Sequence, residues 1–391
     1  MSPFIKVTAR WLLQAVPVIM LVLVSSLLLT ASSIEEFRTN SLSAKEGEEV
    51  TPPSSPVTGL IPEEELSSVV PSGTKTVTYN ESGENITAEV PTGKGKAFSG
   101  LVNGALLVAI GAVSGLTFYL LLKRGKKRAL IIIFSALFLF IISLGCLLDS
   151  YLLLEGAGLW RENLFVPLIL LSILIALPLT GAIVFSPRFR PAALLAISVI
   201  LGVFLAYSLP IYVILPLSVG AALWDWRAAR KGVIKRIVEL EDLLGSTGRR
   251  VAKSAHPGRK TPRKLARKKG KGLPDFTEIG LYDAGEWQIG LGDLVIYSAL
   301  GASIVRHYFV ILPAVGITTL AQGLIVALLL ALSLSLVCLA GLVRTSLYVQ
   351  EGDIFPALPF PVGGMALFYA AYTMVLEVFS LIKTGGLFSP I

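Results

Sequence analysis

The sequence predicts an all-α polytopic membrane protein with about nine transmembrane helices and a short β-hairpin before the seventh. Hydrophobic residues make up 54% of the 391-residue chain and charged residues only 15%, whereas charged residues form about 25% of an ordinary soluble domain. A membrane-spanning helix needs about 20 apolar residues, and the chain contains nine such runs. They lie near 11–32, 101–123, 129–149, 164–186, 191–209, 211–226, 290–312, 322–344 and 357–382.

The first run follows Lys6 and Arg10 and ends in small residues, as a signal peptide does. Its apolar core is longer than the roughly 7–15 residues of a signal peptide, so we expect a retained helix. Five regions follow along the chain. They are a first transmembrane helix in 1–33, an extracytoplasmic hydrophilic loop in 34–98, spans two to six in 99–226, a cytoplasmic basic loop with an amphipathic helix in 227–288, and spans seven to nine in 289–391.

Lysine and arginine indicate which loops face the cytoplasm. The stretch 227–288 holds sixteen Lys and Arg against seven Asp and Glu, whereas 34–98 holds eleven acids against five bases. The second stretch is also rich in Pro, Ser, Thr and Gly, which predicts an exposed, weakly ordered loop on the outer side. With nine spans the loops alternate correctly when the N-terminus is cytoplasmic and the C-terminus extracytoplasmic. We therefore expect a multi-pass integral membrane protein, of the cell membrane if the source is a prokaryote.

The basic loop contains two kinds of segment. Apolar residues at helical spacing in 227–244 predict an amphipathic helix along the membrane surface, and 249–271 is polybasic without periodicity. Basic residues beside a membrane attract anionic lipids, so we expect the lipid bilayer to be its partner, and no nucleic acid. Neither histidine of the chain has a Cys or His neighbour at ligand spacing, so we expect no metal and no cofactor.

Two segments have the alternation of β-strands. The first, 75–79, lies in the outer loop and predicts a short hairpin strand. The second runs from Phe276 to Ile289 and predicts a strand or hairpin that enters the membrane just before the seventh span. A strand edge there can hold an extended peptide by main-chain hydrogen bonds, which makes Ile279 and Leu281 candidates for substrate binding.

Two aspartates lie at the ends of apolar runs, Asp225 at the end of the sixth and Asp293 at the start of the seventh. An ionisable residue at membrane depth costs free energy and marks a functional site by default. Gly290 and Gly292 flank Leu291 just before the second aspartate, and they remove side chains where another backbone or a water molecule must approach. We therefore predict a catalytic pair of aspartates, with these three residues beside the substrate.

A third element lies at the head of the last run, where Pro356 and Pro359 flank Ala357 and Leu358. Prolines leave neighbouring carbonyl and amide groups without helical partners. Such groups are tolerated at membrane depth only inside protein or along a wet cavity. We therefore add Pro356, Ala357 and Leu358 to the predicted substrate-binding residues.

The three elements resemble the motifs of presenilins and signal peptide peptidases. Trp224-Asp225 stands where the family carries Tyr-Asp, and the run from Gly290 to Asp293 is similar to its Gly-Leu-Gly-Asp motif. Pro-Ala-Leu-Pro at 356–359 is similar to the third motif. The order of the motifs, the hydrophilic loop between the first two and the nine spans also resemble the family, although Trp224 departs from the usual tyrosine. The predicted orientation is that of presenilins, because signal peptide peptidases are inverted.

The resemblance implies an intramembrane aspartyl endopeptidase of the GxGD class with a presenilin-like fold, whose partners are transmembrane helices of substrate proteins. It does not decide whether accessory subunits are needed. Two carboxylates that share one proton can supply both the base and the acid of amide hydrolysis. The alternatives are a proton- or cation-conducting channel or transporter, a prepilin-peptidase-like enzyme, and a catalytically silent membrane chaperone. Other acids, such as Asp283, are expected to be solvated residues at the membrane boundary.

Overall fold

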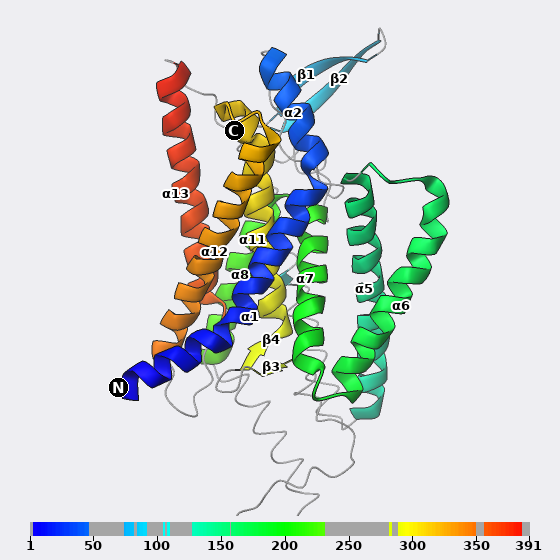
Figure 1. Ribbon diagram of the computed structural model, residues 1–391, viewed down its shortest axis with the longest axis vertical. Helices are drawn as coiled ribbons and strands as arrows, with labels where there is room; N and C mark the ends of the chain where they lie inside the picture. Colours follow the sequence, from blue (N-terminus) through cyan, green and yellow to red (C-terminus); the bar gives the residue numbers. More distant parts are fainter. Residues whose placement is uncertain are drawn as a thin grey trace, which may run out of the picture.

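The protein is an α-helical bundle with two small β-hairpins, as described by a computed structural model (Figure 1). The structure describes residues 3–46, 74–81, 84–91, 105, 108–109, 127–156, 158–230, 281–283, 288–348 and 356–384. The helices are α1 (Pro3–Ser32), α2 (Ile34–Glu46), α5 (Lys127–Gly156), α6 (Phe165–Phe185), α7 (Arg190–Ser208), α8 (Ile211–Arg230), α11 (Leu291–Ile311), α12 (Leu320–Tyr348) and α13 (Pro359–Thr384). Two 3-10 turns, η1 (Glu162–Leu164) and η2 (Leu312–Val315), precede α6 and follow α11.

Six helices among the described residues are long and apolar enough to cross a membrane. A seventh span results if Val16–Ser32 and Ile34–Lys45, which meet at a bend of 56°, are counted together. These seven coincide with seven of the nine predicted runs, which confirms an integral, multi-pass helical protein. Helix α8 covers an eighth run but is less apolar, and the run near 101–123 lies almost entirely outside the described residues. The count of nine therefore stays a prediction.

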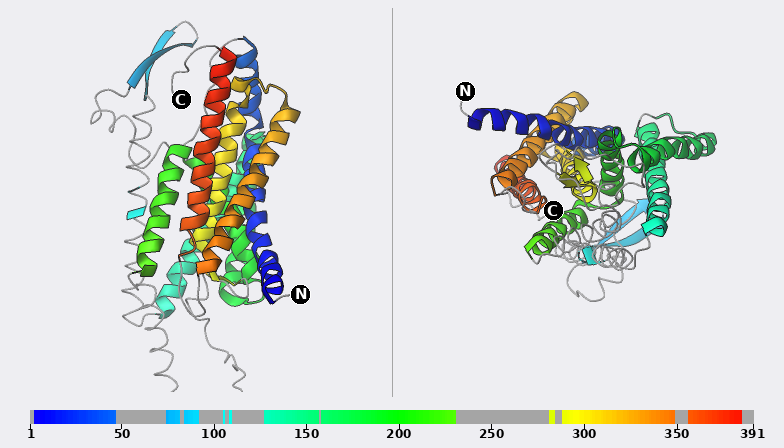
Figure 2. Two further views of the ribbon diagram at one scale, coloured as in Figure 1. Left: turned by 90° about the vertical axis from the view of Figure 1, so that its left-hand side faces the viewer. Right: turned by 90° about the horizontal axis from the view of Figure 1, so that it is seen from below.

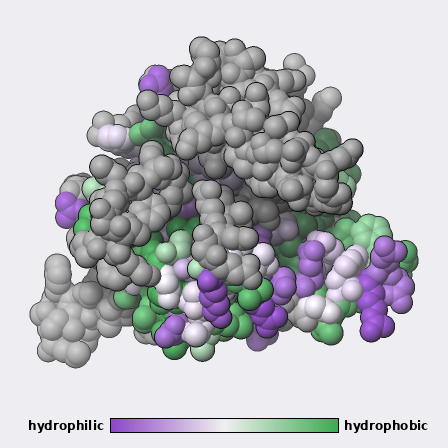
Figure 3. Space-filling view, turned by 90° about the horizontal axis from the view of Figure 1, so that it is seen from above, coloured by the Kyte–Doolittle hydropathy of each residue, from purple (hydrophilic) through white to green (hydrophobic). Residues whose placement is uncertain are grey.

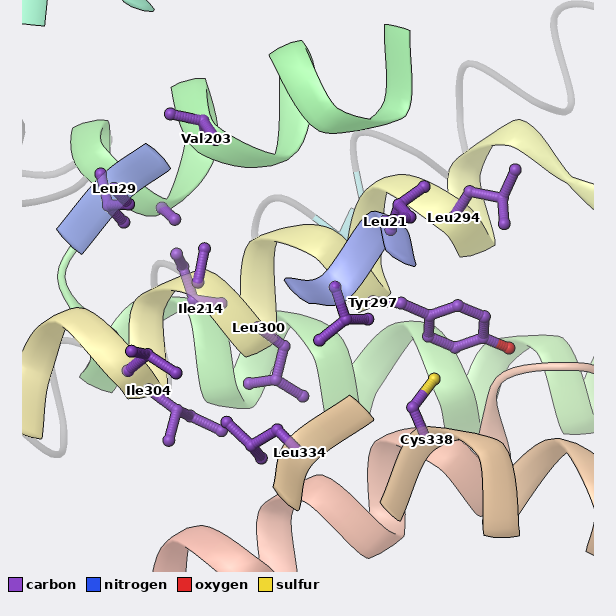
Figure 4. Packing of buried hydrophobic residues seen from close by; sticks show 14 of the residues in the cluster. Leu21, Leu29, Val203, Ile214, Leu294, Tyr297, Leu300, Ile304, Leu334 and Cys338 are labelled. Atoms are coloured by element: carbon purple, nitrogen blue, oxygen red, sulfur yellow. The ribbon is translucent and has the colours of Figure 1, made fainter. Parts of the chain in front are cut away.

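Helix α11 lies at the centre of the bundle, with α1, α7, α8, α12 and α13 around it (Figure 2). Fifteen of its 21 residues are buried, because it is surrounded by protein where the other spans face lipid. Small residues allow this close approach: a Cβ on Gly202 of α7 would overlap the side chain of Ser298. Leu300 and Ile304 of α11 pack against Leu334 of α12 in the core (Figure 4). Helices α5 and α6 form a pair at one side of the bundle (Figure 1).

Helix α2 corrects the expectation of an exposed, weakly ordered segment from residue 34 onward. Phe37 is fully buried and stacks on Phe309 of α11, with ring centroids 4.7 Å apart. The amide Nδ2 of Asn40 donates a hydrogen bond to the carbonyl of Val310 at 3.0 Å. The acidic composition of 34–46 predicted exposure. Helical spacing nevertheless gathers the few apolar and small residues on one face, which packs on the end of α11.

Arg306 of α11 anchors the bend between α1 and α2. Its guanidinium is 3% exposed and donates to Ser33 Oγ at 3.0 Å and to both carboxylate oxygens of Glu36 at 2.9 and 3.2 Å. The guanidinium carbon lies 4.8 Å from the ring centroid of Tyr207 on α7. A buried charge needs such partners. Figure 3 shows the molecule from the end of the bundle that carries α2. Hydrophilic side chains interrupt the hydrophobic surface there, as expected where helices leave a membrane.

The two hairpins fall where strands were predicted. Strands β1 (Thr74–Glu81) and β2 (Glu84–Pro91) pair antiparallel and include the predicted strand at 75–79. Strands β3 (Leu281–Asp283) and β4 (Gln288–Gly290) pair antiparallel directly before α11, at the end of the bundle opposite α2 (Figure 1). The rest of the predicted alternation, 276–280, lies outside the described residues. The same is true of the basic loop over 231–280 with its predicted amphipathic helix.

Candidate active site

Asp293 lies in the first turn of α11, the third residue of the helix. The helix begins after Gly290, whose backbone is extended with φ −67° and ψ 146°. The Gly290 amide donates a hydrogen bond to Asp293 Oδ2 at 3.3 Å. An acid at this position satisfies an otherwise unpaired amide and is stabilised by the helix dipole. The carboxyl group is therefore held by the start of its own helix.

The two predicted glycines have different surroundings. A Cβ on Gly290 would lie 3.2 Å from Asp293 Oδ2, closer than ordinary van der Waals contact. A Cβ on Gly292 would meet nothing within 4 Å. Gly290 is thus needed for the carboxylate to reach the amide beneath it. Gly292 leaves open space beside the acid, and its place beside a substrate stays a prediction. Leu291, between them, is half-buried and packs against the core.

Asp225 lies in α8 and binds the start of a different helix. The Leu358 amide donates a hydrogen bond to Asp225 Oδ2 at 3.2 Å. Leu358 directly precedes α13, and its carbonyl accepts the first bond of that helix from the Val362 amide at 3.0 Å. The Leu358 amide is therefore outside the hydrogen-bond ladder of the helix and is free to bind a carboxylate. The two catalytic candidates each sit at a helix N-terminus, where the dipole favours negative charge.

The packing of α8 against α11 brings the two carboxyl groups together, although they are 68 residues apart in sequence. They are close enough for a Coulombic interaction between Asp225 and Asp293. Asp293 lies at the end of α11 that directly follows β4. Trp224, where the family has tyrosine, is 49% exposed. Like charges this close in a low-dielectric site disfavour simultaneous ionisation, so the pair can share a proton.

The segment Pro356-Ala357-Leu358 lies against Asp225, and its predicted role in substrate binding stays a prediction. Pro356 is buried and Leu358 is 4% exposed. The carbonyl of Ala357 accepts a hydrogen bond of 2.9 Å from the hydroxyl of Tyr297. Tyr297 was not singled out from the sequence. Its position four residues after Asp293, on the same face of α11, is the signal that could have found it.

The remaining candidates concern the hairpin and the other acids. Leu281 lies in β3 and pairs with Gly290, so the hairpin is joined to the start of α11; Ile279 lies outside the described residues. Asp283 ends β3. Asp149 of α5 has one carboxyl oxygen, Oδ1, that is buried without a hydrogen-bond partner in the described part of the chain. The described residues contain no group of three His, Cys, Asp or Glu side chains that could hold a metal ion.

No protein-family model matches this chain, and no curated protein matches it either. The resemblance to presenilins therefore depends on the three sequence motifs.

Proposed function

We propose that the protein is a presenilin-like intramembrane aspartyl endopeptidase, which hydrolyses peptide bonds within transmembrane segments of other membrane proteins. The observation that supports this most is the pairing of Asp225 and Asp293. The two carboxyl groups come from neighbouring helices and interact electrostatically. The Gly290 amide holds Asp293, and the amides of Leu358 and Ala357 hold Asp225. An ionised carboxylate can accept about four hydrogen bonds, so each group keeps acceptor sites for a water molecule and a substrate.

The chemistry follows from the shared proton. The ionised carboxylate removes a proton from water, which attacks the carbonyl carbon of the scissile peptide. The protonated carboxyl group first hydrogen-bonds the carbonyl oxygen and then protonates the leaving nitrogen. No covalent intermediate forms on the protein. The proton belongs to the pair and not to either residue alone, and the amides of Gly290 and Leu358 fix the two groups during the transfer.

A channel or transporter would use the same two acids differently. It would need polar groups that continue from the acids across the membrane. Beyond the acid pair the described core contains large apolar side chains, among them Leu300, Ile304 and Leu334 (Figure 4). The buried polar side chains of α11 there, Ser298, Ser303 and Arg306, do not include a further acid. This packing favours a site that is closed at one end, which suits hydrolysis better than conduction.

The orientation is part of the proposal. With the basic loop 227–288 in the cytoplasm, the acid pair lies toward the cytoplasmic side and α2 toward the outside. Single cysteines placed at 47–98 or at exposed positions of α2 should then react with an impermeant thiol reagent from outside, and those in 246–272 only after permeabilisation. The reverse labelling pattern would instead support the orientation of signal peptide peptidases. The wild-type Cys146 and Cys338 are buried, which keeps the background low.

The hairpin gives the substrate a docking place. A transmembrane helix satisfies its own backbone hydrogen bonds, so it must unwind locally before a peptide carbonyl reaches the acids. We propose that the unwound segment adds as a strand beside β3 and β4 and lies near Pro356-Ala357-Leu358. Proline at Ile279 or Leu281 removes a strand amide and should abolish cleavage of helical substrates while binding of a small aspartyl-directed inhibitor is retained. Normal cleavage by such variants rules out strand docking.

The proposed function is tested with purified protein in liposomes and a single-span test substrate. We expect cleavage that a transition-state inhibitor of aspartyl proteases blocks, and that Asp225→Ala or Asp293→Ala abolishes. The matched control is Asp283→Ala. This aspartate ends β3 and is not part of the acid pair, so the variant should cleave normally. Cleavage that persists in either of the first two variants contradicts the proposal.

A further inference from the structure

We propose that Tyr297 is a positioning residue for the acid pair: its hydroxyl orients the peptide group between Ala357 and Leu358, and this peptide group holds Asp225. The inference rests on the proposed function and adds a residue that the motifs do not contain. Its basis is the juxtaposition of two hydrogen bonds, from Tyr297 to Ala357 at 2.9 Å and from Leu358 to Asp225 at 3.2 Å.

The two bonds meet on a single peptide unit. The carbonyl of Ala357 and the amide of Leu358 belong to the same planar group, and in a trans peptide they point in opposite directions. When the Tyr297 hydroxyl fixes the carbonyl, it therefore also fixes the direction in which the amide points. The amide direction determines where Asp225 Oδ2 is held. No residue outside this peptide is needed to transmit the effect.

Helix α11 connects this peptide to the second acid. Tyr297 follows Asp293 by four residues, so the two side chains leave the same face of the helix one turn apart. The phenol is fully buried, lies beside Cys338 of α12, and is within electrostatic range of both carboxyl groups (Figure 4). One rigid helical turn thus relates Asp293 directly to the group that holds Asp225. Packing of α8 alone would leave the distance between the acids free to vary.

The same helix offers a matched comparison. Tyr308 is also buried, and its hydroxyl donates to the carbonyl of Tyr369 in α13 at 2.8 Å. Its hydroxyl also hydrogen-bonds Thr373 Oγ1 of α13 at 2.6 Å, so it ties α11 to α13 at least as strongly as Tyr297 ties α11 to the segment before α13. Tyr308 lies eleven residues further along α11, which is about 16 Å at 1.5 Å per residue. A tyrosine that only fastens α13 to α11 should act equally at both positions, whereas a positioning residue should act only at the first.

Two readouts on the full-length protein in liposomes test the inference. Tyr297→Phe and Tyr308→Phe each keep the ring and lose one hydroxyl. We expect Tyr297→Phe alone to lower kcat for the single-span substrate about tenfold with little change in KM, as a loss of orientation in the transition state does. We also expect it alone to speed hydrogen exchange of the fragment 356–359. Prolines at both ends of that fragment carry no amide hydrogen, so it reports only the amides of Ala357 and Leu358.

The outcomes separate this inference from the proposed function. Equal kcat values and equal exchange in the two variants overturn the positioning role, while cleavage that depends on both aspartates leaves the protease assignment standing. Faster exchange in Tyr297→Phe, in a protein whose cleavage does not depend on the aspartates, supports the contact geometry and overturns the protease assignment and with it the catalytic role of Tyr297. Unfolding of Tyr297→Phe at a temperature where Tyr308→Phe is folded also overturns it, because the tyrosine is then structural.

Discussion

A close contact between α12 and the backbone of α13 predicts a strong effect of one added methyl group. Gly341 of α12 faces the first turn of α13, where an added Cβ would lie 2.5 Å from the Cα and N of Pro361 and 2.8 Å from the carbonyl carbon of Phe360. All three are backbone atoms and cannot rotate away. Gly341→Ala must therefore push the start of α13 away from α12.

The size of the shift follows from these distances. Ordinary contact begins at 3.4 Å, so the first turn of α13 must move by roughly 1 Å from its present distance of 2.5 Å. The Leu358 amide directly precedes that turn and lies 3.2 Å from Asp225 Oδ2, and a displacement of this size is enough to break the hydrogen bond. Overpacking costs about 1–3 kcal/mol of stability, and a misplacement of about 1 Å in an active site can cost about a hundredfold in rate.

The assay combines thermal unfolding with cleavage of the single-span substrate. Gly341→Ala should lower kcat/KM by about a hundredfold and stability by about 1–3 kcal/mol. Gly363→Ala is the control, since it lies in the same part of α13 but a Cβ there meets nothing within 4 Å. It should leave cleavage unchanged. If Gly341→Ala cleaves like wild type, the start of α13 does not position Asp225 and our account of that contact is wrong.

Two further substitutions test the glycine at the start of α11 and the anchor of the α1–α2 bend. Gly290→Ala brings a methyl group to 3.2 Å from the carboxylate of Asp293 and should lower kcat about tenfold while thermal stability changes by less than about 1 kcal/mol; an unchanged kcat shows that the carboxylate does not depend on this amide. Arg306→Met removes the guanidinium that binds Glu36, whose side chain is 26% exposed. It should cost about 2–3 kcal/mol by thermal unfolding, less than the roughly 3–5 kcal/mol of a fully buried pair, and a combined Glu36→Gln change should recover part of the loss.

Much of the fold could be predicted because helices in a membrane must be long and apolar. Seven predicted runs coincide with candidate spans, and alternation in sequence identified both hairpins. The packed position of α2 could not be predicted, because its acidic residues dominate its composition. The contacts that bury it are made by Arg306 and Phe309, which are about 270 residues away in sequence.

Part of the candidate site could be predicted from the sequence, because its residue types are rare in apolar segments. Acids at the ends of apolar runs and prolines at the head of a helix are conspicuous, so Asp225, Asp293 and Pro356 were found without a structure. Tyr297 was not found, since its spacing of four residues from Asp293 acquires a meaning only when the carbonyl that it binds is known. That carbonyl belongs to Ala357, which precedes α13 and lies 60 residues further along the chain.

The central claim is that Asp225 and Asp293 act as one catalytic unit, and a double-mutant cycle tests it most directly. Asp225→Asn, Asp293→Asn and the double variant keep the side-chain volume, and cleavage of the single-span substrate is measured for each in liposomes. Residues that act as a unit are strongly non-additive, so each single variant should lose as much activity as the double variant, and all three should reach the uncatalysed background. Activity that remains in either single variant, with losses that multiply in the double variant, would show two independent acids and contradict the account.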